Sequence, residues 1–382
     1  MASLTRRFAL AASALSLLVL VMSAVASAAI TVTNTNDTGA GSLRAAITSA
    51  NSSPTVATTI NFSVSGTITL GSALPAIANS SPNGSLTIDG SGQSITVDGA
   101  STFQILTVNS GATLTVENLT MSDGSATLGG GIENEGTLTV SNCTFSGDIG
   151  TDGGDGGAIY NTGVLTVTNS TFSGNSAGSG GALDNHATLT ITSSTFSGNS
   201  APMGAGGAIR NVGSLKLTNS TFSGNSADVA GLGGAIDNAN GASMTIANST
   251  FSGNSVSGED QFGHTGHGGV IENFGSATLS GVILAASTGG GNCDNVFPGS
   301  KLPTSAGFNI SDDSSCGFSG TSINSSTTLN LDPRGLQNNG GPTQTIALEA
   351  GSDAIDLIPS TACVDANGLP LTLDQRSLPR PG

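Results

Sequence analysis

One motif recurs along the middle of the chain, and this repeat limits the possible folds more than any other feature. Its first half reads Gly-Gly-Ala-Ile-x-Asn with small variations, and its second half ends in Asn-Ser-Thr-Phe-Ser-Gly-Asn-Ser. The first half occurs six times, at residues 130–134, 156–161, 180–185, 206–211, 233–238 and 268–273. The phenylalanines of the second half follow at steps of 27, 24, 26 and 29 residues, as Phe145, Phe172, Phe196, Phe222 and Phe251.

The segments between these markers alternate with a period of two. Leu165-Thr166-Val167-Thr168 is an example, with its aliphatic residues on one face and its threonines on the other. A unit of about 25 residues with three short strands joined by turns makes one coil of a three-sided parallel solenoid. The repeat therefore predicts an all-β chain, a right-handed parallel β-helix of the pectin-lyase-like type.

Stacked coils bring equivalent residues about 4.8 Å apart, so each repeated residue should form a row along the helix. We expect the phenylalanines to stack inside and the asparagines three residues later to form hydrogen-bonded ladders at a corner. Asp148 takes the asparagine slot in the first unit. The motif pairs are Phe172 with Asn175, Phe196 with Asn199, Phe222 with Asn225, and Phe251 with Asn254.

The repeats predict a β-helix over residues 85–290, in about nine coils. Leu119 is expected in the phenylalanine slot before the regular repeats, and Leu284 in that slot of the last coil. Residues 291–382 lose the repeat and gain proline and cysteine, so we expect a C-terminal cap and an irregular tail there.

Residues 29–84 are expected to hold the N-terminal cap and the first strands, because a solenoid needs covered ends. Within them Ser42 suits the N-cap of a short helix that ends near Asn51. The helix would turn one apolar face toward the first coil. That face consists of Leu43, Ala46, Ile47 and Ala50.

The N-terminal segment resembles an export signal over residues 1–28. Arg6 and Arg7 precede an apolar run, and Ala26-Ser27-Ala28 fits a cleavage site. The general secretory route is the default expectation, and the twin-arginine route stays open. We expect a secreted or cell-surface protein with no membrane span after cleavage.

Removing Arg6 and Arg7 leaves seven basic against 25 acidic residues, a formal charge of −18. This balance argues against nucleic acid as a partner, because no basic patch is available to neutralise phosphates. The charge pattern indicates a soluble extracellular chain, which we expect to be monomeric and without a cofactor.

Four cysteines fit no zinc-binding spacing, and an oxidising compartment favours a disulfide. Cys293 and Cys316 flank a loop rich in Gly, Ser and Asp and are the expected pair. Cys143 stands where other repeats carry Ser, so we expect a buried free thiol. The pairing of Cys363 stays open.

Both ends of the chain carry motifs of known surface proteins. Gly-Ser-Leu-Arg-Ala-Ala-Ile at 41–47 resembles the CSLREA motif of bacterial β-helix proteins, with Gly41 and Ala45 in place of that motif's Cys and Glu. Residues 339–343, 351–356 and 374–376 resemble the choice-of-anchor Q module. The repeats also resemble those of polymorphic outer membrane proteins, which implies adhesion as a role for the Phe and Asn pairs. The same residues also have a purely structural interpretation, in which Phe faces the interior and Asn turns a corner.

The main alternative is a polysaccharide-degrading lyase or hydrolase. Gly266-His267-Gly268 resembles an element of polygalacturonases, but Asp312 and Asp313 follow the His instead of preceding it, and no Arg-x-Lys is present. His264 and His267 lie in an enlarged loop, which a surface insertion explains. A lyase would need calcium-binding Asp residues beside a basic residue. We therefore expect no catalytic residues and no enzyme activity.

Two other binding modes are open. Asp152 and Asp155 lie in a Gly-rich turn that could bind calcium weakly, although their order does not fit the calcium-binding nonapeptide. Outward threonine ranks could bind ice or glycans, but Lys216 and Ala247 interrupt them. The sequence favours a non-enzymatic, adhesin-like or structural scaffold whose partner, if any, is a surface glycan or protein. Function should then lie in outward positions around Asp152, Lys216 and His267.

Overall fold

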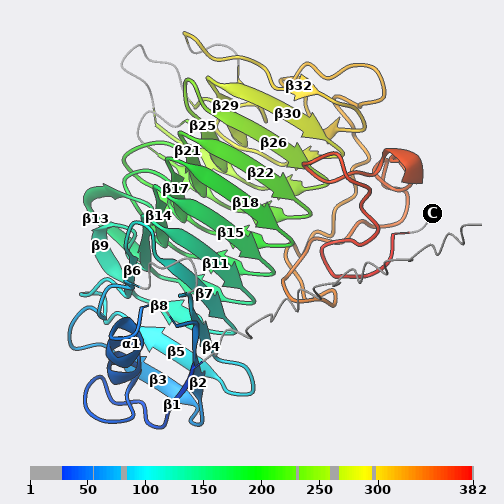
Figure 1. Cartoon of the computed structure of the whole chain (residues 1–382). Helices are drawn as coiled ribbons and strands as arrows, with labels where there is room; N and C mark the ends of the chain where they lie inside the picture. The colour runs from blue at the N-terminus through cyan, green and yellow to red at the C-terminus, as the bar shows by residue number, and fades with distance from the viewer. Residues whose placement is uncertain are drawn as a thin grey trace, which may run out of the picture.

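The computed structural model describes residues 28–54, 56–78, 84–228, 232–258, 266–294 and 298–380. Within these ranges the chain winds into a solenoid whose strands stack in parallel from one end to the other (Figure 1). Three sheets form its sides, and each strand pairs with the equivalent strand of the next coil. The predicted parallel β-helix is confirmed. The predicted signal, residues 1–28, lies outside the described residues except for Ala28.

The longest side has eleven described strands, whose five-residue members alternate buried aliphatic and outward polar residues. This eleven-stranded sheet contains β1 (Ala28–Val32), β2 (Thr58–Phe62), β4 (Leu86–Asp89), β7 (Thr113–Glu117), β11 (Thr137–Ser141), β15 (Val164–Thr168), β18 (Thr188–Thr192), β22 (Ser214–Thr218), β26 (Ser243–Ala247), β30 (Ser276–Ser280) and β32 (Thr304–Ser305). It extends beyond the nine coils predicted, because β1 and β32 continue the stack into the two end segments.

The second side carries the phenylalanines. This ten-stranded sheet contains β3 (Gly66–Thr69), β5 (Ile95–Asp98), β8 (Thr120–Ser122), β12 (Thr144–Ser146), β16 (Thr171–Ser173), β19 (Thr195–Ser197), β23 (Thr221–Ser223), β27 (Thr250–Ser252), β31 (Ile283–Ala285) and β33 (Ile310–Ser311). Leu284 pairs with Phe251 as predicted. The assignment of Leu119 was wrong: Met121 pairs with Phe145, because Leu119 lies at the preceding corner, two residues earlier.

The third side is formed by the Ile-x-Asn segments. This seven-stranded sheet contains β6 (Leu106–Val108), β10 (Ile132–Asn134), β14 (Ile159–Asn161), β17 (Leu183–Asn185), β21 (Ile209–Asn211), β25 (Ile236–Asn238) and β29 (Ile271–Asn273). Smaller ladders edge the turns that lead to it: β9 (Ser125–Leu128) pairs with β13 (Ile149–Asp155), and β20 (Ser200–Ala201), β24 (Ser226–Ala227) and β28 (Ser255–Val256) pair with one another.

Corners between the sheets require left-handed backbone. Asn169, Asn219 and Asn248 turn the corner between the eleven- and ten-stranded sheets with φ values of 51 to 52°. Before β10 and each later strand of the seven-stranded sheet, the Gly three residues ahead of the buried Ile or Leu has positive φ; at Gly180 a Cβ would strike the Leu183 carbonyl oxygen. These positions explain why the motif repeats Asn and Gly.

A short helix covers the N-terminal end, as predicted. Helix α1 (Leu43–Asn51) is capped by Ser42, whose hydroxyl accepts a hydrogen bond from the Ala45 backbone N–H. Leu43, Ala46, Ile47 and Ala50 are its buried residues. They join the core that runs through the solenoid.

The C-terminal tail runs back along the side of the stack (Figure 1). It includes the 3₁₀ helix η1 (Ser360–Ala362) and follows the corner between the eleven- and ten-stranded sheets. Asn219 Nδ2 donates to the Leu373 carbonyl at 2.9 Å, and Thr221 donates to the buried Gln375 side chain at 2.7 Å. The tail thus contacts several coils and lies away from the seven-stranded sheet.

The cysteines follow the sequence expectations. Cys293 and Cys316 form a disulfide, whereas Cys143 and Cys363 are buried free thiols. Burial raises the pKa of Cys143 to about 11, which keeps it as an unreactive thiol.

The internal phenylalanine stack gives a stability test. Phe196 lies between the rings of Phe172 and Phe222, so Phe196→Ala should lower the free energy of unfolding by about 3 to 5 kcal/mol through lost burial and a cavity. Thr190→Ala, on the outward face of the eleven-stranded sheet, should change it by less than about 0.5 kcal/mol. Denaturant unfolding followed by circular dichroism measures both. Equal effects would contradict an internal stack.

Candidate functional site

The motif residues proposed for adhesion lie inside the solenoid. Phe145 and the four motif phenylalanines stack with ring centroids 4.6 to 4.9 Å apart and planes within 17°. Each motif asparagine is fully buried; Asn199 Nδ2 donates to Asn225 Oδ1 at 2.9 Å and to the Phe172 carbonyl at 3.0 Å. Phe172, Asn175, Phe196, Asn199, Phe222, Asn225, Phe251 and Asn254 all have zero exposure, so a partner of the folded chain does not reach them.

A different row of side chains gathers the ionisable groups of the repeats. It consists of the central residue of each strand from β10 to β29 in the seven-stranded sheet, between a buried Ile or Leu and a buried Asn. We name this row the polar column. From β10 to β29 it contains Glu133, Tyr160, Asp184, Arg210, Asp237 and Glu272, paired in register from coil to coil.

Asp184 is the centre of the column and is fully buried. His186 Nε2 lies 2.9 Å from Asp184 Oδ1, and Arg210 Nη1 lies 3.3 Å from Asp184 Oδ2. The Arg210 Nε atom also approaches Asp237 Oδ2 at 4.0 Å. The Tyr160 ring lies 5.1 Å from the His186 ring, tilted by 48°.

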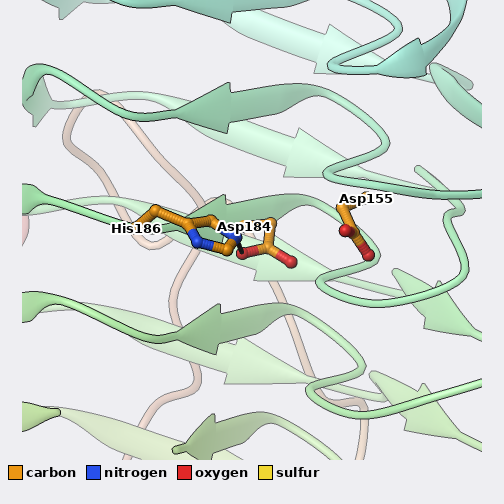
Figure 2. A group of neighbouring side chains, drawn as sticks. All are labelled: Asp155, Asp184 and His186. Carbon is orange, nitrogen blue, oxygen red and sulfur yellow. Dashed lines mark ion pairs between the residues drawn. The ribbon is translucent and has the colours of Figure 1, made fainter. Parts of the chain in front are cut away.

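Asp155 reaches the same place from a different element. It ends β13, in the turn that leads to the seven-stranded sheet, and its carboxylate faces Asp184 (Figure 2). Ligand atoms of Asp155, Asp184 and His186 all lie within 4.8 Å of one another. These three residues could hold a metal ion.

Burial and neighbouring charges shift several pKa values in the column. Asp184 raises the pKa of His186. Burial, with the nearby Asp184, raises the pKa of Asp155. Burial raises the pKa of Asp237 to about 7 and that of Glu272 to about 9, the latter helped by repulsion from Asp294 and Asp237.

Access to the column differs along its length. Asp184, Asp237 and Glu272 are buried, at 0%, 4% and 0% exposure. The side chains of His186 and Arg210 are each 31% exposed, and Glu133 and Tyr160 are partly exposed. An external ligand therefore meets the column on the β10, β14 and β21 coils.

The residues considered for catalysis are not brought together. His267 is buried, with its Nδ1 atom 2.5 Å from Asp294 Oδ2. Asp312 and Asp313 accept hydrogen bonds from backbone N–H groups near the C-terminal end, including those of Ala286 and Asn292. His264 lies outside the described residues.

The other outward positions named from the sequence have separate surroundings. Asp152 lies in the irregular middle part of β13 with positive φ and is not part of the Asp155 group. Lys216 interrupts a rank of threonines on the eleven-stranded sheet and donates to Asn367 of the tail at 2.7 Å. That rank is Thr59, Thr87, Thr115, Thr139, Thr166, Thr190, Lys216, Thr245, Thr278 and Thr304.

The family model described as right handed beta helix region matches residues 103–323. The chain belongs to this right-handed β-helix family. The right-handed form of the predicted solenoid is therefore confirmed, and the match includes every residue of the polar column. No curated protein matches the chain.

Among the described residues, two cavities of about 390 and 310 Å³ involve the tail of this β-helix. The larger cavity lies where tail residues such as Leu357, Ile358 and Arg380 meet the solenoid, and the smaller one is lined by tail residues. Neither includes a member of the polar column. Within the described ranges, no helix is long and apolar enough to cross a membrane.

The raised carboxyl pKa values predict a pH dependence for the stability of this β-helix. Asp237 and Glu272 bind protons more tightly in the folded than in the unfolded chain, so the folded chain is favoured at low pH. The free energy of unfolding should fall as pH rises from about 4 through 7 and on to 9, by up to about 1.4 kcal/mol per pH unit for each group. Glu272→Gln should flatten this fall above pH 7.

Denaturant unfolding at a series of pH values measures the slope. The matched control is Asp152→Asn, a change at an exposed residue of β13, which should leave the slope unchanged. A stability that stays level between about pH 5 and 9 in the unmutated chain would contradict buried protonated carboxyls.

Proposed function

We propose that this β-helix is exported and acts outside the cell as a non-enzymatic, adhesin-like scaffold that binds a glycan through its polar column. One observation carries the proposal: the repeated motif residues are buried, whereas the residues that vary from coil to coil include the exposed members of one column. The constant residues are then required for folding, and the variable exposed residues are available to bind a partner.

The exposed part of the column has the chemistry that sugar recognition uses. Tyr160, the only tyrosine of the chain, offers a ring face beside His186. Arg210 donates and Glu133 accepts hydrogen bonds on coils to either side. Three coil spacings separate Glu133 from Arg210, about 14 Å, which suits a short oligosaccharide.

Export is supported by two independent features. The N-terminal 28 residues have the charge, apolar run and small-residue site of a signal peptide. The Cys293–Cys316 disulfide fits an oxidising compartment.

The end motifs support a finer assignment, to surface proteins of the CSLREA and choice-of-anchor Q type. The first motif supplies helix α1, which covers the first coils. The second supplies Gln375, which is buried against Thr195 and Thr221 of adjacent coils. Through these contacts the tail holds adjacent coils of the solenoid together.

A non-enzymatic role is supported by the burial of the acidic residues. A general acid or base must come within hydrogen-bond reach of the substrate, and Asp184, Asp237 and Glu272 are covered. The pKa of Asp237, about 7, is the observation that favours a polysaccharide lyase or hydrolase instead. Both functions are therefore tested together.

A glycan panel that includes polygalacturonate separates the two functions. We expect binding without release of products, and Tyr160→Ala should weaken binding by at least about tenfold, because the ring face is lost. Val164→Thr, an exposed change on the eleven-stranded sheet, is the control and should bind like the unmutated chain. Isothermal titration calorimetry measures affinity, and chromatography of the glycan measures turnover.

Turnover that disappears in Asp237→Asn would establish the enzyme and overturn the scaffold proposal. Glycan binding that is equally strong in Tyr160→Ala and Val164→Thr would show that the polar column is not the binding face.

A further inference from the structure

The Asp155, Asp184 and His186 group has a feature that glycan binding does not explain. Asp184 is fully buried, and its Oδ1 atom accepts no hydrogen bond with good geometry. The neighbouring His186 Nε2 atom lies 2.9 Å away and forms an ion pair with that oxygen, without hydrogen-bond geometry. Buried polar atoms are normally satisfied, so this oxygen calls for a partner.

We propose that Asp155, Asp184 and His186 form a binding site for a divalent transition-metal ion of the zinc class. Two carboxylates and one imidazole are a donor set that Zn²⁺ accepts, whereas Ca²⁺ and Mg²⁺ take oxygen ligands almost alone. With three protein ligands the ion keeps an open position for water or an external ligand.

The geometry needs little adjustment. Ligand atoms around one Zn²⁺ lie about 3 to 4 Å apart, given bonds of about 2.0 to 2.2 Å. The 2.9 Å between His186 Nε2 and Asp184 Oδ1 is close to this range. Asp155 completes the set within 4.8 Å, so its carboxylate has to move by only about 1 Å.

Local charge favours a cation despite the presence of Arg210. The guanidinium lies beside Asp184 Oδ2, the other oxygen of that carboxylate, and also approaches Asp237. Asp155 and Asp184 Oδ1 then remain to face His186. A metal ion on these atoms would leave the Arg210 contact in place.

Neighbouring coils fold with other residues at two of the three ligand positions. Ser179 pairs with Asp155 in the next coil, and Thr162 precedes His186 by one coil. A solenoid that places Ser and Thr at equivalent positions does not need Asp and His for folding. A metal site explains why Asp155, Asp184 and His186 lie close together between adjacent coils.

The test is Zn²⁺ titration of the full-length protein after removal of metal with a chelator, followed by calorimetry and by native mass spectrometry for stoichiometry. We expect one Zn²⁺ per chain, with Ca²⁺ binding much more weakly. Asp155→Ser and His186→Thr should each lower Zn²⁺ affinity by at least about tenfold. Both changes copy residues that the neighbouring coils already carry, so both variants should fold.

Asp237→Asn is the matched control, since it lies in the same column, beside the same Arg210 and outside the cluster. It should keep Zn²⁺ affinity within about twofold. Absence of Zn²⁺ binding, preference for Ca²⁺, or equal Zn²⁺ affinity in His186→Thr and the unmutated chain would each overturn the proposal. None of these outcomes depends on whether the protein binds a glycan.

Discussion

The fold depends on in-register stacking of parallel coils. Because each strand pairs with the same segment of the next coil, every inward position becomes a row of neighbours about one strand spacing apart. Such a row packs most regularly where its side chains are alike, as in the parallel phenylalanine rings or the ladder from Asn175 to Asn254. The sequence repeats because this constraint acts on the interior positions of every coil.

The outward rows are free of that constraint. The residue types that they contain differ from one row to another. Threonine occupies most positions of the outward rank on the eleven-stranded sheet. Lys216 takes the position at which the tail crosses this rank. The polar column of the seven-stranded sheet repeats no residue type between Glu133 and Arg210. It also retains buried carboxylates such as Asp237 and Glu272, at a cost in stability that the core does not require. Variation and retained charge are together the reason why we propose this column as the functional face.

The sequence predicts the architecture well because the architecture is periodic. It identified the phenylalanine stack, the asparagine ladder, the Ser42-capped helix and the Cys293–Cys316 disulfide, and it misplaced Leu119 by two residues where the repeat is degenerate. It did not identify the polar column, because its members are 24 to 35 residues apart and change residue type from each coil to the next. The available signal was the variable residue inside each Gly-Gly-Ala-Ile-x-Asn unit. Asp155 lies on a turn of irregular length, so only the structure brings it to Asp184.

The central claim is that inward rows make the fold while the polar column makes the function. Its most direct test is a chain in which Glu133, Tyr160 and Arg210 are all changed to Thr, the residue that Thr107 already contributes to the same row. Thermal unfolding and glycan binding are then measured on one preparation beside the unmutated chain. The account predicts a melting temperature within about 4 °C of the unmutated chain and loss of glycan binding. Glycan binding that survives in a folded triple variant would contradict it.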